Sequence, residues 1–379
     1  MKAIYLDYAA ATPLSAQVQK VMEPFMRNVF YNPSAIYAGA REAKQALETA
    51  RANVARSIGA RPSEVIFTAG GTESANLAIR GIAEAFPEGE IIVSAIEHDA
   101  VLKPAKHVGA KIVGVTSKGV VDLRQLEEAI SDNTVLISVM YANNEVGSVQ
   151  PLKEIVDIAA RIRKQRAKTG SGMPLYVYTD ACQAPQYLDI NVARLGVDLM
   201  TLNGGKIYGP KQSGILYHRT GVVLSPQILG GGQEQGYRSG TENVAAYVGF
   251  AKALELSVNK RAHSVKTVSE LAHGFTKELE DKFGAIVNGH RKLRIPNNIH
   301  VSFPAVDNER VLFSLDDRGV YAAAGSACSA SSEEASHVLL AMGLTEDEAR
   351  SSIRFSIGVE TTRAELDHVI EALDRALKA

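Results

Sequence analysis

The sequence has few cysteines, no long apolar run and no excess of charge of either sign. Two cysteines in 379 residues cannot form a disulfide framework. The first residues, Met-Lys-Ala-Ile-Tyr-Leu-Asp, lack the charged, apolar and cleavage regions of a signal peptide. We therefore expect a protein of the reducing cytoplasm.

The remaining absences narrow the class of protein. Although 46% of the residues are hydrophobic, their runs are too short to cross a bilayer, so no membrane partner is expected. Lys and Arg number 41 against 42 Asp and Glu, and these totals give no basic face for nucleic acid. No internal repeat, low-complexity tract or polar linker is present. These features favour a globular protein of two domains that acts on a small molecule.

Short β-rich runs alternate with amphipathic helical segments over the first two thirds of the chain. The runs predicted as strands are 64–68, 91–96, 111–115, 135–141, 175–179, 199–202 and 214–217. Helical periodicity is present over 74–85, 125–130 and 151–164. This alternation predicts an α/β fold with a mainly parallel sheet flanked by helices.

The pattern changes from about Val244. A long helix running toward Phe283 is followed by a strand over 299–303, a helix near Arg310 and a closing helix from Thr362. We interpret this part as a smaller α+β C-terminal domain. The predicted large domain is 14–249, and the predicted small domain combines 1–13 with 250–379.

Lys206 is the most informative single residue. It lies in Leu-Asn-Gly-Gly-Lys-Ile-Tyr-Gly-Pro-Lys after a predicted strand, and Asp180 and Gln183 follow the strand before it. A lysine amine forms a Schiff base with pyridoxal phosphate, and a carboxylate keeps the pyridine nitrogen protonated. Most lysines are solvated loop residues, but the glycines around Lys206 allow a flat ligand to approach the backbone closely.

Other polar residues follow strand ends, where ligands collect in α/β sheets. Gly71 and Thr72 open a helix whose N–H groups suit a phosphate, although such a turn is also an ordinary helix cap. His98 can stack on a pyridine ring or be a partly buried structural residue. Asn143 and Asn144 can donate to a ring oxygen or shape a turn.

A glycine-rich segment begins at Gly230 and ends in Arg238, Ser239 and Thr241, three side chains that can bind phosphate. It lacks the strand-to-helix context of a dinucleotide fingerprint, so we discount a nicotinamide site.

Cys328 and Arg354 are the candidate residues of the C-terminal part. Cys328 lies in Ala-Ala-Gly-Ser-Ala-Cys-Ser-Ala-Ser-Ser, a run of small side chains that we expect to be mobile, which suits a thiol that must reach a substrate. Cys182, just after a strand, is interpreted as structural. Arg354 alternates with apolar residues and suits either a carboxylate clamp or a structural ion pair.

Together these residues resemble the cysteine desulfurase family, the fold-type I pyridoxal phosphate enzymes that take sulfur from L-cysteine. The resemblance covers nearly the whole chain and includes Tyr-Leu-Asp-Tyr-Ala-Ala-Ala-Thr-Pro from Tyr5, Asn-Pro-Ser from Asn32, Gly-Gly-Thr-Glu-Ser-Ala-Asn, Asn-Asn-Glu-Val-Gly, Arg-Ser-Gly-Thr-Glu-Asn and Ser-Ser-Ile-Arg-Phe-Ser. Gly-Ser-Ala-Cys-Ser is similar to the subgroup with the longer cysteine loop, which is tied to iron–sulfur cluster assembly and tRNA thiolation.

The resemblance implies a role for each matching residue. The implied catalytic residues are Lys206, which would hold the cofactor, His98, which would stack on it, and Cys328, which would accept sulfur as a persulfide. The implied cofactor-binding residues are Gly71, Thr72, His98, Asn144, Asp180, Gln183, Asn203, Gly205, Lys206 and Thr241, the last from the second subunit of a homodimer. The implied substrate-binding residues are Asn32, Asn144 and Arg354. L-alanine would be released, and an acceptor protein would take the sulfur.

Two positions depart from the family pattern. Better-known members carry Ser and His where this chain has Asn203 and Gly205, so the phosphate site loses two side-chain donors and relies on Asn203, backbone N–H groups or water. Three alternatives stay open from the sequence: an aminotransferase of the same fold, a selenocysteine lyase, and an assembly protein that kept the fold without the cofactor.

Overall fold

The computed structural model describes residues 3–325 and 335–378. Cys328 and the small side chains next to it lie outside the described residues.

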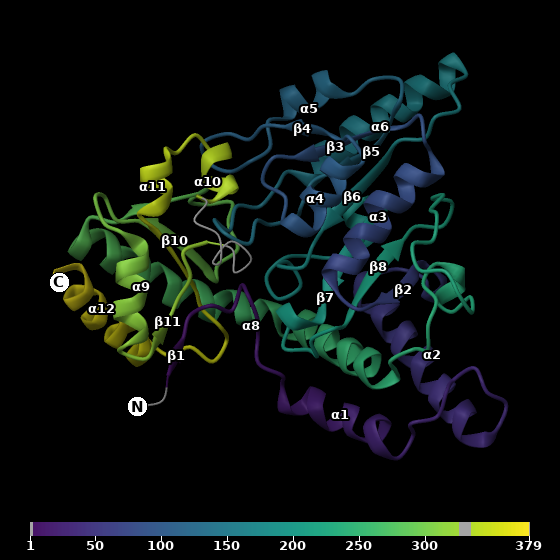
Figure 1. Ribbon diagram of the computed structural model, residues 1–379, viewed down its shortest axis with the longest axis horizontal. Coiled ribbons are helices and arrows are strands. Elements are labelled where there is room, and N and C mark those ends of the chain that lie inside the picture. The colour runs from purple at the N-terminus through teal and green to yellow at the C-terminus, as the bar shows by residue number, and fades with distance from the viewer. Residues whose placement is uncertain (1–2, 326–334, 379) are drawn as a thin grey trace.

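A seven-stranded sheet forms the centre of the larger part of the molecule (Figure 1). Its strands are β2 (Val65–Thr68), β3 (Glu90–Ser94), β4 (Lys111–Val113), β5 (Thr134–Ser138), β6 (Tyr176–Asp180), β7 (Leu199–Asn203) and β8 (Gly214–His218). The spatial order is β2-β8-β7-β6-β5-β3-β4. Only β8 runs antiparallel, to both β2 and β7. The predicted mainly parallel sheet and all seven predicted strands are therefore confirmed.

Helices cover both faces of this sheet. One face packs against α3 (Gly71–Ala85) and α4 (Asp99–His107). The other face packs against helices that are far apart in the sequence, namely α1 (Ala16–Arg27), α2 (Ala38–Ile58), α5 (Leu123–Ala129), α6 (Leu152–Thr169), α7 (Val192–Leu195) and the first part of α8 (Val244–Phe283). Because consecutive strand residues point to opposite faces, Val65 and Phe67 join the second core and Ile66 joins the first.

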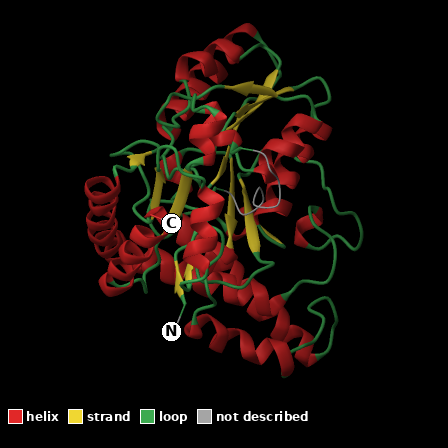
Figure 2. Ribbon diagram, turned by 60° about the vertical axis from the view of Figure 1, so that its left-hand side comes forward, coloured by secondary structure: helices red, strands yellow, loops and turns green. Residues whose placement is uncertain are grey.

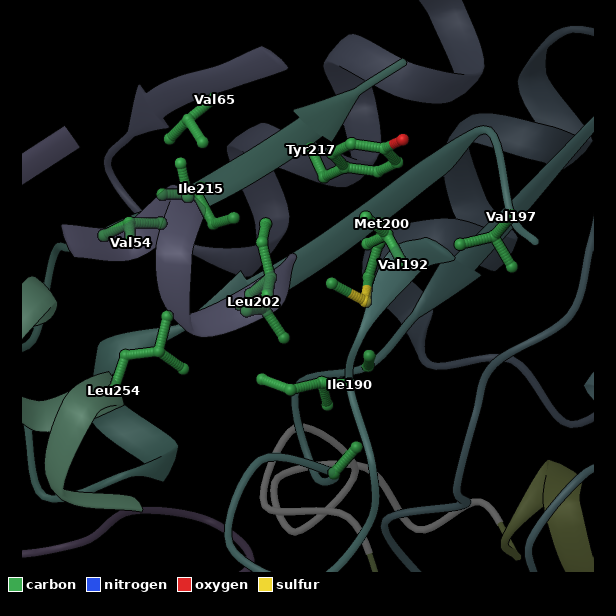
Figure 3. Close-up of a cluster of buried hydrophobic side chains, with 14 of the residues drawn as sticks. Val54, Val65, Ile190, Val192, Val197, Met200, Leu202, Ile215, Tyr217 and Leu254 are labelled. Atoms are coloured by element: carbon green, nitrogen blue, oxygen red, sulfur yellow. The ribbon is translucent and has the colours of Figure 1, made fainter. Parts of the chain in front are cut away.

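Figure 3 shows part of the second core. Leu202 from β7 and Ile215 from β8 lie on the side of Val54 of α2 and Leu254 of α8, and Met200 from β7 lies next to Val192 of α7. These side chains are buried, and the apolar area that they remove from water stabilises the sheet that carries the candidate site.

The smaller part contains two small sheets, which Figure 2 shows apart from the large one. One sheet has the order β12-β10-β9, and the other pairs β1 with β11 in parallel. Their bounds and those of the helices around them are β1 (Ile4–Tyr5), β9 (Ile286–Val287), β10 (Asn298–Ser302), β11 (Val320–Tyr321), β12 (Ser352–Ser356), α9 (Asn308–Asp316), α10 (His337–Ala341), α11 (Glu346–Arg350) and α12 (Arg363–Lys378). The N-terminal segment therefore pairs with the C-terminal part of the chain.

Helix α8 runs through both parts without a break. Its first half buries Tyr247, Phe250 and Leu254 in the core of the large sheet. Its second half buries Phe275 and Leu279 in the core of the smaller part. The domain boundary that we predict after residue 249 thus falls inside one continuous helix.

No helix in residues 3–325 or 335–378 combines the length and the apolar character that a membrane span requires.

Candidate functional site

A cavity of about 220 Å³ lies beyond the carboxyl ends of the parallel strands. It brings together nine of the residues that the sequence nominates: Gly71, Thr72, His98, Asn144, Asp180, Gln183, Asn203, Lys206 and Arg354. A second cavity of about 500 Å³ adjoins it, shares Gly71, Thr72, Asn203 and Lys206 with it, and adds Gly205. The parallel strands β3, β5, β6 and β7 end at this edge, which is where α/β sheets bind ligands.

Lys206 closes a single 3₁₀ turn, Gly204–Lys206, directly after β7. Its ammonium Nζ donates to the carbonyl oxygens of Ala9 at 3.0 Å and Ala10 at 2.7 Å. Burial lowers the pKa of Lys206, although Cys182 and Asp180 partly oppose this effect. A half-buried lysine with a lowered pKa is suited to covalent attachment of an aldehyde and to proton transfer.

Asp180 is the last residue of β6, and its side chain faces the cavity. Its Oδ1 accepts a hydrogen bond from the backbone N–H of Cys182 at 2.9 Å. Burial raises the pKa of the Cys182 thiol well above its usual value, and the Asp180 carboxylate adds to the effect. Cys182 is thus a neutral, buried thiol next to a carboxylate.

His98 is the N-cap of α4, and its ring lines the cavity. Its Nδ1 accepts the backbone N–H of Ala100 at 3.0 Å, so the neutral ring carries its proton on Nε2. Burial lowers the pKa of His98, and the opposing charge of Asp180 does not cancel this. A flat, neutral imidazole therefore faces the cavity.

Glu97 is a residue that the sequence interpretation passed over. Its side chain is fully buried, and Oε1 accepts the backbone N–H of Met140 at 2.6 Å. Burial raises the pKa of Glu97 well above its usual range, with Asp180 contributing. The raised pKa favours the protonated form of this buried acid, which lies next to Met140 of the cavity lining. The only sequence signal that could have pointed to Glu97 is its position next to His98, because nothing in the local sequence shows that this strand end is buried.

The two asparagines that follow β5 have different environments. The Oδ1 of Asn143 accepts the backbone N–H groups of Glu145 and Val146, each at 2.9 Å, so Asn143 shapes a turn. Asn144 lines the cavity. Its carbonyl oxygen accepts from Arg354 at 3.1 Å and from Asn298 at 3.0 Å. Asn143 therefore shapes the turn, and the predicted contact of Asn144 with a ring oxygen stays a prediction.

Arg354 is held on β12 and is almost completely buried. One terminal nitrogen donates to Oδ1 of Asp7 at 2.6 Å, and the other donates to the Asn144 carbonyl. Arg354 thus forms a structural ion pair and also faces the cavity, as a carboxylate clamp requires. Gln183 lies near it and donates to the Ala9 carbonyl at 3.0 Å.

The opening of α3 is suited to a phosphate. Its N-cap Gly70 has a φ of 123° and provides no side-chain cap, so the first N–H groups of a 15-residue helix stay open. A Cβ on Gly71 would lie only 3.1 Å from Sγ of Cys182 and 3.4 Å from Nδ2 of Asn203, so a side chain would fill this cradle. The site thus has an amine for the aldehyde, a carboxylate for the pyridine nitrogen and open helix N–H groups for the phosphate. These are the groups that pyridoxal phosphate requires.

Two of the residues with implied roles, Asn32 and Thr241, do not line these cavities in the described part of the chain. Asn32 is exposed between α1 and α2, where its Oδ1 accepts the backbone N–H of Ser34 at 2.9 Å. Thr241 is exposed in the loop before α8. Cys328 lies outside the described residues. The roles of all three stay predictions.

Comparisons with known proteins agree with this geometry. The aminotransferase class-V family model matches residues 4–369. The cysteine desulfurase IscS of Dictyoglomus turgidum is 42% identical over 383 residues, which cover 99% of this chain and 94% of that protein. A solved structure of a NifS-like protein matches with a TM-score of 0.91 and 33% identity over 99% of both chains.

Another solved structure, described as SspA in complex with cysteine, has a TM-score of 0.81 and 34% identity, and the match covers 95% of this chain and all of that one. The matches thus run through both parts of the molecule and both sides of the cavity. The chain therefore belongs to the class-V aminotransferase family and, within it, to the cysteine desulfurases, which are pyridoxal phosphate-dependent enzymes.

Proposed function

We propose that this cysteine desulfurase transfers the sulfur of L-cysteine to the thiol of Cys328 and releases L-alanine. The observation that carries the proposal is the convergence of Lys206, Asp180, His98 and Arg354 on one cavity at the strand ends. The related structure described as a complex with cysteine supports the choice of substrate.

Pyridoxal phosphate, bound through Lys206, supplies an electron sink for the substrate carbon. Asp180 would keep the pyridine nitrogen protonated, and His98 would lie against the ring. The remaining cofactor residues are Asn144 and Gln183 at the ring oxygen and Gly71, Thr72, Asn203 and Gly205 at the phosphate.

Different residues of the chain take part in different steps of the reaction. Arg354 binds the substrate carboxylate, because its guanidinium faces the cavity and is held in orientation by Asp7 and the Asn144 carbonyl. Lys206 removes the α-proton, which its lowered pKa favours. The neutral imidazole of His98 can donate a hydrogen bond from Nε2–H, because its Nδ1 already accepts the backbone N–H of Ala100.

The sulfur transfer then balances without an outside oxidant. The Cys328 thiolate attacks the substrate sulfur, so an S–S bond forms while the substrate C–S bond breaks. The electron pair of that bond remains with the substrate carbon, which takes a proton and leaves as alanine. L-cysteine and one thiol therefore become L-alanine and one persulfide.

A single-turnover experiment tests this assignment. Wild-type protein mixed with one equivalent of L-cysteine should give one alanine and one persulfide per chain, whereas Cys328→Ser should give neither at the wild-type rate. The matched control is Cys182→Ser, which should keep the persulfide. Sulfur release by Cys328→Ser at the wild-type rate would overturn the assignment, and formation of a keto acid would point to an aminotransferase. Activity on selenocysteine alone would point to a lyase.

We also propose a homodimer. The side chains of Met26, Phe30, Ile36 and Tyr37 are between 52% and 88% exposed near the α1–α2 connection, an arrangement that a second copy would cover. Asn32 lies in the same connection, and the dimer would let Asn32 and Thr241 reach the neighbouring site. Light scattering should give twice the chain mass, and Phe30→Glu should lower it to one chain.

The sulfur acceptor in this proposal is a protein of iron–sulfur cluster assembly or tRNA thiolation in the cytoplasm. The IscS name of the relatives supports the first of these. Incubation of the persulfidated protein with extract of its own cells, followed by labelling of protein persulfides, identifies the acceptor.

A further inference from the structure

The part of the site that is proposed to bind the phosphate contains one cationic side chain to which no role has been assigned. The charged side chains among the described residues that line the 500 Å³ cavity are Glu73, Lys206 and Lys211. Glu73 is paired with Arg238 at 2.8 Å, and Lys206 is committed to the aldehyde of the cofactor. A phosphate monoester carries between one and two negative charges at neutral pH, so Lys211 is the cation left to balance them.

Gly205 leaves space beside this lysine. A Cβ at position 205 would lie 3.5 Å from Oδ1 of Asn203, 3.8 Å from Cγ of Lys211 and 3.9 Å from its Cδ. The methylene stem of Lys211 therefore borders the volume that a larger side chain at 205 would occupy. Because residue 205 is a glycine, it puts no side chain of its own between Lys211 and the cradle formed by Gly71 and Asn203.

The turn that carries Lys211 is fixed by the fold. Ser213 donates through Oγ to the Pro210 carbonyl at 2.6 Å, and the N–H of Gly204 donates to the Ser213 carbonyl at 2.8 Å. Gln212 has a left-handed φ of 56°, a conformation that is unfavourable for a non-glycine residue. The surrounding contacts hold the lysine at the cavity in spite of this strain.

The present partner of the Lys211 ammonium is a weaker one than a phosphate. Its Nζ donates to the neutral carbonyl oxygen of Thr12 at 2.6 Å. A lysine side chain has a flexible stem, and hydrogen bonds to a charged acceptor are about twice as strong as those to a neutral one. A phosphate in the cavity can therefore draw the ammonium away from Thr12.

We propose that Lys211 is the cation that binds the 5′-phosphate of the cofactor in this chain, in place of the side-chain donors lost at Asn203 and Gly205. This inference rests on the cofactor role given to Lys206 above. It concerns the phosphate only and assigns Lys211 no part in proton transfer or sulfur transfer.

Cofactor binding to the apoprotein tests the inference without an activity assay. Titration with pyridoxal phosphate and with pyridoxal, which lacks the phosphate, should give two dissociation constants that Lys211→Met affects differently. We expect the Kd for pyridoxal phosphate to rise at least tenfold and the Kd for pyridoxal to change less than twofold. Lys211→Arg, which keeps the charge, should recover most of the affinity, and Lys103→Met should change neither constant.

A second variant distinguishes a loss of phosphate binding from a loss of folding. Gly205→His in the Lys211→Met background puts a donor at the position beside the missing lysine and should restore affinity for pyridoxal phosphate alone. Equal changes for the two ligands, or no change for either, would overturn the inference while the proposed function stands. Wild-type protein that takes up neither ligand would overturn both.

Discussion

The guanidinium of Arg354 and the carboxylate of Asp7 form an ion pair at 2.6 Å across 347 positions of sequence. Arg354 is on β12 of the C-terminal part, and Asp7 follows β1 at the other end of the chain. The pair compensates a charge that would otherwise be buried alone. It also fixes the orientation of the guanidinium before a substrate carboxylate enters.

The first prediction concerns this arginine. Arg354→Lys keeps a positive charge but loses the planar fork, so we expect the KM for L-cysteine to rise about tenfold or more with little loss of bound cofactor. Steady-state kinetics measure this. Arg166→Lys is the matched control, because Arg166 is also buried but donates to backbone carbonyls such as that of Thr134. It should lower stability and leave KM unchanged.

The second prediction concerns Asp180. Asp180→Asn can still accept the hydrogen bond from the Cys182 N–H, but its amide has no charge to hold the pyridine nitrogen protonated. We expect kcat to fall by about 100-fold or more while the fold and cofactor content are kept. Rapid-mixing kinetics and the absorbance of the bound cofactor measure this. A variant with wild-type kcat would show that the carboxylate does not serve the ring nitrogen.

Much of the fold follows from local patterns. The seven strands of the large sheet and helix α8 have apolar residues at the spacing that their structures require. Three strand predictions extend too far: Ile96 and Met140 are buried apolar residues beyond the ends of β3 and β5, and Val115 is a half-buried one beyond the end of β4. Helix α2 was not predicted, since alanines such as Ala40 and Ala43 form much of its buried face and give a weak periodic signal.

The candidate site, too, could be predicted only in part from local sequence patterns. Lys206, Asp180 and His98 could be predicted because each lies at or shortly after a strand end and belongs to a recognisable sequence motif. The contacts that these side chains make could not be predicted, since the contacts join segments that are far apart in the sequence. The Ala9 and Ala10 carbonyls that accept from Lys206 are 197 and 196 positions away. Likewise, the raised pKa of Glu97 results from tertiary burial, which its neighbours in sequence do not reveal.

The third prediction separates the two cysteines by reactivity. Burial raises the pKa of Cys182 well above its usual value, and the thiolate is the species that reacts with alkylating agents. Iodoacetamide at pH 8 should therefore label Cys328 in the folded protein at least tenfold faster than Cys182, and both equally in denaturant. Mass spectrometry of the digested protein measures the two rates. Faster labelling of Cys182 would contradict its structural interpretation.

The fourth prediction is a pH dependence of stability. His300 is fully buried on β10, and burial lowers its pKa to about 3, with Arg354 and Arg294 contributing. Below about pH 6.5 the unfolded chain binds a proton at this histidine while the folded chain does not. The free energy of unfolding should therefore decrease as the pH falls from about 6.5 toward 3, by up to about 1.4 kcal/mol per pH unit from this group.

Urea unfolding at several pH values between 4.5 and 7.5 measures this slope. His300→Asn should flatten it, because an asparagine can still accept from Asn288 but does not titrate. The control is His273→Asn, which changes an exposed histidine of α8 and should leave the slope unchanged. An unaltered slope in His300→Asn would assign the effect to other groups.

The attachment of the cofactor to Lys206 tests the whole account most directly. Purified protein supplied with pyridoxal phosphate and reduced with borohydride should lose an absorbance band near the edge of the visible range. Mass spectrometry should then find the pyridoxyl group on the Nζ atom of Lys206. Protein that stays colourless, or a pyridoxyl group on another lysine such as Lys211, would contradict it.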